Sequence, residues 1–191
     1  MLLHPVFLRQ KTQNQLIVDE LNSRLLDPNT RRAAFEETVR LYGPQLYRHI
    51  RSMVLTHDDA DDVMQETFLK AWAALDQFKG EAKVSTWLYR IATNESLSFL
   101  SRRRSSVALE DTDVERTLQS DPYFDGDELQ LQLQKAIATL PDKQRLVFNM
   151  KYYQQMKYEE MSEILKTSVG ALKASYHIAV KKIETFFNNR D

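Results

Sequence analysis

The stretch FKGEAKVSTWLYRIATNESLSFLSRRR, residues 78–104, decides how the rest of the chain is interpreted. It begins in a short loop that holds Gly80 and two lysines, continues with apolar residues at helical spacing, and ends on three consecutive arginines. Aromatic rings stack on unpaired bases, amides hydrogen-bond base edges, and arginines hold the backbone. The stretch therefore predicts a helix that contacts exposed nucleic-acid bases.

Helical spacing assigns the residues of this segment to two different faces of the predicted helix. Ser85 is the expected N-cap, and Thr86, Arg90 and Asn94 share the face that is expected to meet nucleic acid. The buried stripe is expected to consist of Leu88, Ile91, Ala92 and Phe99.

The composition describes a soluble globular protein, because 42% of its 191 residues are hydrophobic and 28% are charged. The chain has no apolar run approaching the roughly 18 residues of a membrane span, and the run near its start is too short for a secretory signal. The sequence predicts a cytoplasmic protein without membrane insertion.

The residue counts argue against several kinds of chemistry. There are no cysteines, the four histidines lack metal-ligand spacing, and the 4 glycines form no phosphate-binding motif. No serine, histidine and carboxylate arrangement suggests a catalytic site. We therefore expect no catalytic residue, no metal and no cofactor, and a helical enzyme lacks support.

The net charge of −1 is unevenly distributed. Residues 1–104 hold 15 Lys and Arg against 13 Asp and Glu, residues 105–134 hold 1 against 8, and residues 135–191 hold 10 against 6. Affinity for DNA that does not depend on sequence scales with the phosphates neutralised. The chain alone is therefore expected to bind duplex DNA poorly and to need a scaffold.

The periodicity predicts an all-α protein of two small helical domains, residues 1–104 and 128–191, joined by an acidic flexible linker, residues 105–127. In the first domain we expect a helix at 14–26, a second from Thr30 that Gly43 and Pro44 interrupt, and a third at 46–54.

The next helix has an apolar stripe and an acidic face. Trp72 of the stripe, like Trp87 later, is expected to be a core residue. The stripe consists of Met64, Phe68, Ala71, Trp72 and Leu75. The other face, with Asp62, Gln65, Glu66 and Leu69, is either solvated behind an N-terminal charge cap or an acidic docking face centred on Leu69.

The second domain shows a helix-turn-helix pattern. Helices are expected from Glu128, from Pro141 and over Tyr158 to Leu165, followed by a short turn and a final helix. The outward stripe of the final helix is small and basic, as a recognition helix in a major groove requires. It contains Lys173, Ala174, His177 and Lys181.

Three motifs in this order resemble one family. Asp59 to Trp72, DADDVMQETFLKAW, is similar to the region-two signature of bacterial RNA polymerase sigma factors of the extracytoplasmic-function (ECF) group, sigma-70 family. Ser85 to Asn94, STWLYRIATN, with the arginine run, resembles the segment that reads the minus-ten promoter element. Leu140 to Ile183 resembles region four, whose helix-turn-helix reads the minus-thirty-five element.

The resemblance implies a transcription initiation factor with core RNA polymerase and promoter DNA as partners, both duplex and melted non-template strand, and commonly an anti-sigma factor. It implies that polymerase binds the acidic helix at Asp61, Asp62, Gln65, Glu66 and Leu69. It implies minus-ten contacts by Lys79, Lys83, Ser85, Thr86, Arg90, Asn94, Arg102 and Arg103. It implies minus-thirty-five contacts by Thr167, Ser168, Lys173, Ala174, His177 and Lys181.

The sequence also departs from this family pattern. Many relatives have phenylalanine at Val84, in the loop expected to capture a flipped base, and aspartate at Ser98. Many have arginines at Ser175, Ile178 and Val180, so weaker backbone contact is expected at the upstream element. The alternative function is a stand-alone helix-turn-helix regulator, which would bind duplex DNA without polymerase.

Overall fold

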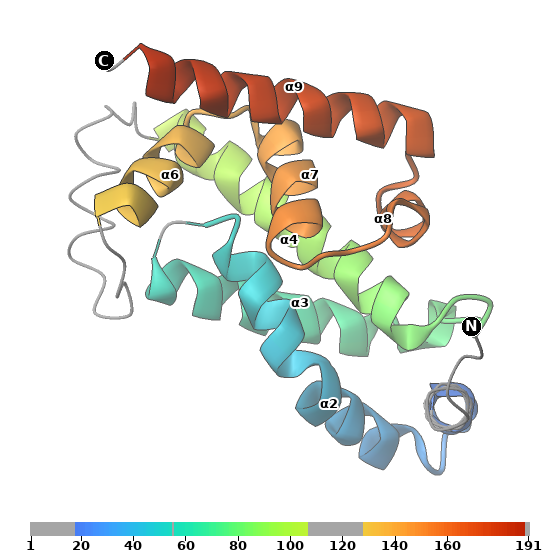
Figure 1. The fold of residues 1–191 in the computed structure, drawn as a ribbon. Helices are drawn as coiled ribbons and strands as arrows, with labels where there is room; N and C mark the ends of the chain where they lie inside the picture. Colours follow the sequence, from blue (N-terminus) through green and yellow to red (C-terminus); the bar gives the residue numbers. More distant parts are fainter. Residues whose placement is uncertain (1–17, 55, 107–127, 190–191) are drawn as a thin grey trace.

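The computed structural model describes residues 18–54, 56–106 and 128–189, and the regular structure within these ranges is helical, without a strand (Figure 1). The prediction of an all-α protein is therefore confirmed. The predicted linker lies outside the described residues from 107 to 127, and α4 continues to Ser106, two residues past the predicted end of the first domain at 104.

The described residues begin with a helical segment at 18–26. The elements that follow are α2 (Arg31–Arg51), α3 (His57–Ala73), the 3-10 turn η1 (Leu75–Gln77), α4 (Val84–Ser106), α6 (Glu128–Ala138), α7 (Asp142–Tyr152), α8 (Tyr158–Leu165) and α9 (Val169–Asn188).

Helix α2 corrects one prediction, because it runs through Gly43 and Pro44 without interruption. A proline in a helix interior removes one hydrogen bond and costs about 3 kcal/mol. The side chains of Tyr42, Leu46 and Ile50 are buried on either side of it. Burying each large apolar side chain contributes about 1.5 to 3 kcal/mol, so the burial of these three side chains outweighs the cost of the proline.

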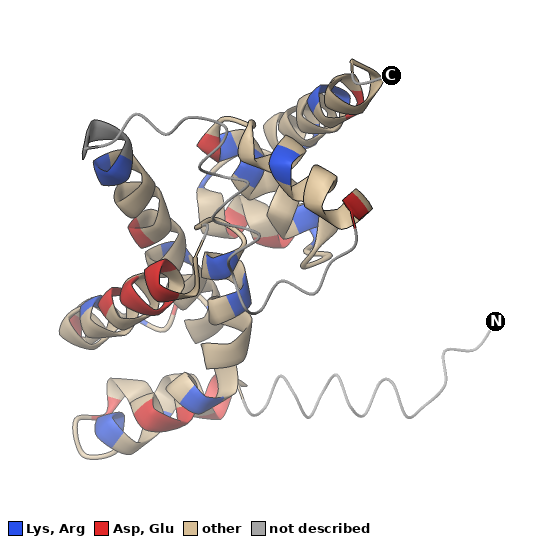
Figure 2. Ribbon diagram, turned by 90° about the vertical axis from the view of Figure 1, so that its left-hand side faces the viewer, with Lys and Arg blue, Asp and Glu red and all other residues tan. Residues whose placement is uncertain are grey.

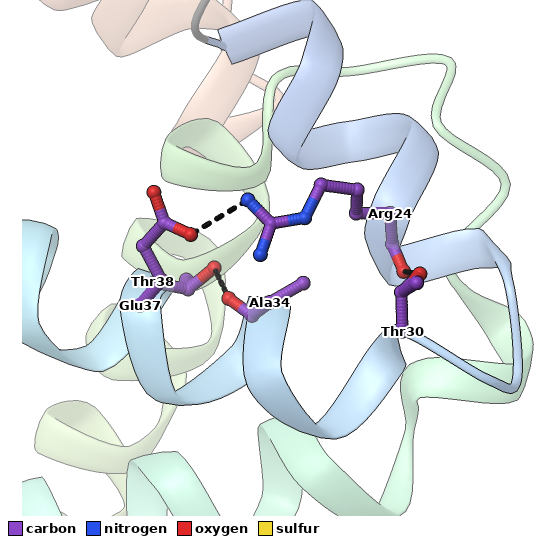
Figure 3. A network of polar contacts seen from close by, with 5 residues as sticks. All are labelled: Arg24, Thr30, Ala34, Glu37 and Thr38. Atoms are coloured by element: carbon purple, nitrogen blue, oxygen red, sulfur yellow. Dashed lines mark hydrogen bonds and ion pairs between the residues drawn. The ribbon is translucent and has the colours of Figure 1, made fainter.

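The N-terminal helical segment is held against α2 by side chains (Figure 3). Arg24 forms an ion pair with Glu37 at 2.7 Å, and the hydroxyl of Thr30 donates to the carbonyl oxygen of Arg24 at 2.8 Å. Leu21 and Leu25, at the spacing expected of this helix, are buried in the core.

Helix α4 begins at Val84, two residues earlier than a cap at Ser85 predicts, so Ser85 lies within the helix and is not its N-cap. The side-chain oxygen of Asn22 accepts a hydrogen bond from the Val84 amide at 3.2 Å, while the Asn22 amide donates to the Ala82 carbonyl at 3.3 Å. A residue far away in sequence therefore takes the capping role. Ser85 instead hydrogen-bonds Tyr42, which partly offsets the rise that burial causes in the pKa of that phenol.

The buried face of α3 is rotated relative to the predicted stripe. It consists of Ala60, Val63, Thr67 and Ala71. Met64 and Phe68 are half-buried, and Trp72, predicted to be a core residue, is 45% exposed, with its ring centroid 5.2 Å from that of Phe35. Trp87 fits its predicted packing role better, since its ring lies 5.0 Å from the buried Phe78.

The second domain forms the predicted helix-turn-helix. Lys166, with a φ of 52°, ends α8 in the left-handed conformation, and Ser168 caps α9 by accepting a hydrogen bond from the Ala171 amide. In α6, Leu129, which stands at helical spacing with Leu133 in the sequence, is 67% exposed, whereas Leu131 is buried. Leu133, Ile137 and Leu140 nevertheless pack with Ala179 and Ile183 of α9.

The two halves of the chain share a core. Figure 1 shows α4 passing behind α7, and α4 also contacts α8. Leu88 and Ala92 of α4 belong to the same buried cluster as Val147, Met150 and other residues of the second domain. The helix-turn-helix therefore lies directly on the first domain in this structure.

We expect Asn22→Ala to lower the free energy of unfolding by about 1 to 2 kcal/mol, because it removes the cap of α4 and the bond to Ala82. The urea unfolding midpoint measures this loss. Asn29→Ala is the matched control, since Asn29 is exposed and bonds only within its own turn to Asp27. Equal shifts for the two variants would contradict the capping role.

Candidate nucleic-acid interface and docking face

The exposed side of α3 carries the predicted docking residues. Thr56 caps this helix by accepting a hydrogen bond from the Asp59 amide at 3.0 Å. Leu69 is 57% exposed and Trp72 lies one turn further along the same helix. All the predicted polymerase-binding residues are exposed: Asp61, Asp62, Gln65, Glu66 and Leu69. We call these five residues the α3 face, and the acidic members are marked red in Figure 2.

The carboxylates of α3 have different roles. Asp58 and Asp59 lie in the first turn, where the helix dipole favours negative charge, and Asp59 forms an ion pair with Arg103 of α4. Asp62 and Glu66 instead line a hollow of about 260 Å³ with Arg102. The charge-cap interpretation therefore suits the first turn, whereas the α3 face is an accessible acidic surface with an apolar centre.

The loop before α4 is anchored at both ends and polar between them. Phe78 and Val84 are buried, while Lys79 and Lys83 are exposed. Gly80 has a φ of +71°, and a Cβ placed on it would lie 3.1 Å from a methyl group of Leu26. The backbone conformation therefore favours glycine at this position, and both lysines of the loop are exposed to solvent.

The predicted base-reading face of α4 lies toward the second domain. Thr86 is half-buried and Asn94 is exposed. Arg90 is half-buried, and its guanidinium donates a hydrogen bond to the main-chain carbonyl oxygen of Glu163 at 3.0 Å. The half-buried Ser85 lies one residue before Thr86, and its bond to Tyr42 points to a structural role.

The two arginines predicted to contact DNA at the end of α4 differ. Arg102 is exposed at the hollow beside the α3 face. Arg103 is half-buried in its ion pair with Asp59 and ties α4 to α3. The structure therefore leaves Arg102 more accessible to a phosphate than Arg103.

The outward stripe of α9 is fully accessible. Lys173, Ala174, His177 and Lys181 are all exposed. The turn residues are partly engaged, because the Thr167 hydroxyl donates to the Leu165 carbonyl at 3.1 Å and Ser168 caps α9. A small-and-basic stripe behind a helix-turn-helix turn has the composition of a major-groove reader.

A cavity of about 570 Å³ lies between α4 and the second domain. The α4 residues that line it include Arg90, Thr93 and Asn94, so it brings together the predicted base-reading face and the helix-turn-helix. From the second domain it is lined by Lys143, Leu146, Val147, Ile164, Leu165, Lys166, Thr167, Ala171, Leu172 and Ser175.

His49 of α2 connects the two halves and was not singled out by sequence reasoning. Its Nδ1 lies 3.0 Å from the Gln154 amide nitrogen and its Nε2 lies 2.9 Å from the Thr93 hydroxyl. Burial lowers the pKa of His49 to about 4, although its bond with Gln154 acts in the opposite direction.

A second polar contact crosses the same boundary. The Asn149 amide donates to the Ser52 carbonyl at 2.5 Å. These partners lie about a hundred positions apart in the sequence and follow no periodic pattern, so only the folded structure reveals them. Among the described residues, no group of three His, Cys, Asp or Glu has a metal-binding arrangement, and no helix is long and apolar enough to cross a membrane.

Comparison with known families gives two matches in chain order. The model of sigma-70 region 2 matches residues 38–106, and that of sigma-70 region 4 matches residues 130–183. A relative described as ECF RNA polymerase sigma factor SigW, from Bacillus subtilis (strain 168), is 33% identical over 75% of this chain and 83% of its own length.

The chain belongs to the ECF group of the sigma-70 family. It is accordingly a transcription initiation factor that directs RNA polymerase to promoters, and the alternative of a stand-alone regulator is not favoured. Core RNA polymerase and promoter DNA are its partners.

Solved structures support the fold of this sigma factor. CnrH in complex with the cytosolic domain of CnrY covers 91% of this chain and 99% of its own, with a TM-score of 0.66 and 24% identity. Sigma factor RpoE in complex with the anti-sigma factor NepR, from Bartonella quintana, covers 81% of this chain and 96% of its own, with a TM-score of 0.61 and 24% identity.

The buried neutral His49 makes stability depend on pH. The unfolded chain takes up this proton near pH 6.5 and the folded chain only near the lowered pKa of about 4, so stability falls as the pH decreases below 6.5. Between pH 7 and pH 5 this contributes a loss of about 2 kcal/mol.

Urea titrations at both pH values test this loss in the wild type and in His49→Gln, which should show a flatter dependence. The matched control is His177→Gln, because His177 is exposed on α9. Identical pH dependence in all three proteins would contradict the assignment to His49.

Proposed function

We propose that this sigma factor docks on core RNA polymerase through the α3 face and reads a two-part promoter with α4 and α9. The observation that carries the proposal is Leu69, a large apolar side chain that is 57% exposed within an acidic surface. An apolar anchor surrounded by polar residues is typical of a binding surface, and its acidic rim suits a basic partner.

At the minus-ten element, α4 and the preceding loop help to melt the duplex. Lys79 and Lys83 hold the backbone of the non-template strand, and Arg90 and Asn94 contact its unpaired bases. Ser85, Thr86, Arg102 and Arg103 complete the predicted set, with Ser85 and Arg103 acting mainly through the packing of α4.

At the minus-thirty-five element, the start of α9 enters the major groove. Ala174 allows close approach, Lys173 and Lys181 hold phosphates, and His177 reaches base edges. Thr167 and Ser168 present the start of α9 to the DNA. The protein acts in the cytoplasm, where polymerase and promoters are found, and catalyses no reaction itself.

An anti-sigma factor is a further proposed partner. Support comes from the similar RpoE, which was solved with the anti-sigma factor NepR. Affinity purification of the tagged chain from its native cells tests this proposal by identifying a bound inhibitor. Recovery of polymerase but never of an inhibitor, under inducing and non-inducing growth, would count against it.

Run-off transcription with purified core polymerase on genomic fragments tests the central proposal. We expect promoter-dependent transcripts only when both the chain and core polymerase are present. A gel shift on the same promoters at physiological salt should show binding by the chain with polymerase and not by the chain alone. Tight binding by the chain alone would instead support the stand-alone regulator.

We expect Leu69→Ala to weaken core polymerase binding about tenfold, because truncating a central apolar anchor costs 1 kcal/mol or more. Leu129→Ala is the matched control, since Leu129 is 67% exposed outside the α3 face. Fluorescence titration of labelled chain with core polymerase gives both affinities. Equal affinities for the two variants would contradict the assignment of the α3 face as the docking site.

The two proposed roles should be separable. Arg90→Ala should abolish promoter opening and preserve polymerase binding, whereas Asp62→Lys should weaken polymerase binding by reversing a charge on the α3 face. Permanganate footprinting reports opening, and the same titration reports binding. Matching defects in both variants would undo the assignment of α3 and α4 to different partners.

A further inference from the structure

The loop before α4 rests on the N-terminal helical segment, residues 18–26, through one asparagine. The side-chain amide of Asn22 donates to the Ala82 carbonyl at 3.3 Å, and its side-chain oxygen accepts from the Val84 amide at 3.2 Å. These partners lie 60 and 62 positions further along the chain. Asn22 thus uses both its donor and its acceptor on main-chain groups, and it fixes the path of the loop between them.

Leu26 makes a second contact with the loop, one helical turn beyond Asn22. A methyl group of Leu26 would lie 3.1 Å from a Cβ placed on Gly80, so the turn at Gly80 lies directly against this side chain. A third anchor holds the chain before the loop, where Arg31 pairs with the exposed Asp76 at 2.5 Å. Exposed ion pairs contribute little, so Asn22 and Leu26 carry most of the anchoring.

Exposed and half-buried residues alternate along the loop. The exposed residues are Lys79, Glu81 and Lys83. The two half-buried residues between them, Gly80 and Ala82, are those that Leu26 and Asn22 contact. The N-terminal segment therefore supports one side of the loop, and the other side, with the two lysines proposed to hold the melted strand, stays free for DNA.

The supporting segment has no other role in the proposed promoter contacts. Asn22, Leu26 and Arg31 all precede residue 38, where the match to sigma-70 region 2 begins. Leu21 and Leu25 are buried and fix the segment in the core, whereas Leu26 is 44% exposed. The segment is therefore a rigid support, and the residues that it turns toward the loop are not needed to fill the core.

We propose that Asn22 and Leu26 are positioning residues of the minus-ten reader: they hold the loop in the conformation in which it distinguishes the base that it captures. This inference rests on the proposed function and adds that residues without DNA contact set part of the promoter specificity. Recognition of a base needs donors and acceptors placed within about 0.5 Å. Release of the loop therefore lowers selectivity at the promoter position that the loop reads and preserves it at the positions that α4 reads.

The variant Asn22→Asp separates the support of the loop from the capping of α4. A carboxylate still accepts from the Val84 amide and is favoured by the helix dipole, but it cannot donate to the Ala82 carbonyl. The urea unfolding midpoint of Asn22→Asp should therefore lie above that of Asn22→Ala, while both variants lose selectivity alike. Asn29→Asp makes the same change in the turn that follows, where the Asn29 side chain bonds to Asp27.

Selectivity is measured on the promoter found by run-off transcription, with each of the four bases placed in turn at every position of the minus-ten element. Permanganate footprinting of the complex with core polymerase gives the rate of opening for each template. In Asn22→Asp the ratio between the best and the worst base should fall about tenfold at one position.

Leu26→Ala should lower selectivity at the same position as Asn22→Asp. Its matched control is Leu41→Ala, because Leu41 is 45% exposed on α2 and Leu26 is 44% exposed. Unchanged selectivity at every position in Asn22→Asp and Leu26→Ala would overturn the proposal. An equal loss at all positions, in step with a lower unfolding midpoint, would also overturn it, because that pattern reports general destabilisation.

A second readout uses the free protein and separates this inference from the proposed function. Trypsin should cleave after Lys79 and Lys83 about tenfold faster in Asn22→Asp and Leu26→Ala than in the two controls, because cleavage needs a released loop. If cleavage is faster while run-off transcription fails, the support of the loop stands and the initiation role falls. If transcription succeeds while cleavage and selectivity match the controls, the initiation role stands and the positioning role falls.

Discussion

The burial of α4 is the constraint on which the rest of the structure depends. Val84, Leu88 and Ala92 have no exposed surface, and elements from both ends of the chain supply their surroundings. The N-terminal segment caps the helix through Asn22, α2 and α3 pack along it, and α8 crosses it. Helix α4 therefore lies in the core of the first domain, packs against the docking helix α3 and contacts the second domain.

Local signals in the sequence predicted much of the second domain. Pro141 marks the start of α7, and the predicted short turn after Leu165 is present and ends at Ser168, which caps α9. Each of these features depends on residues within one or two helical turns, so each can be predicted from the sequence before the fold is known. The exposed faces of α3 and α9 were predictable for the same reason, because helical spacing separates polar from apolar positions.

The predictions that failed depend on residues distant in sequence. Pro44 does not end α2 because neighbouring side chains are buried by other helices, and Ser85 does not cap α4 because Asn22 does. Trp72 is largely exposed because the buried face of α3 is formed by smaller residues such as Ala71. The bond between His49 and Gln154 joins residues 105 positions apart, and no periodic pattern in the sequence predicts it.

The unpaired polar atoms between the halves have a consequence for how such a sequence can change. Replacing Asn149 and Gln154 by apolar residues of similar size would remove two unpaired oxygens, but it would also take a hydrogen-bond partner from the Ser52 carbonyl and from the buried His49 ring, at a cost of about 1 to 3 kcal/mol each. The two amides therefore join the halves of the chain at a cost, because each makes one hydrogen bond across the boundary and leaves its own oxygen unpaired.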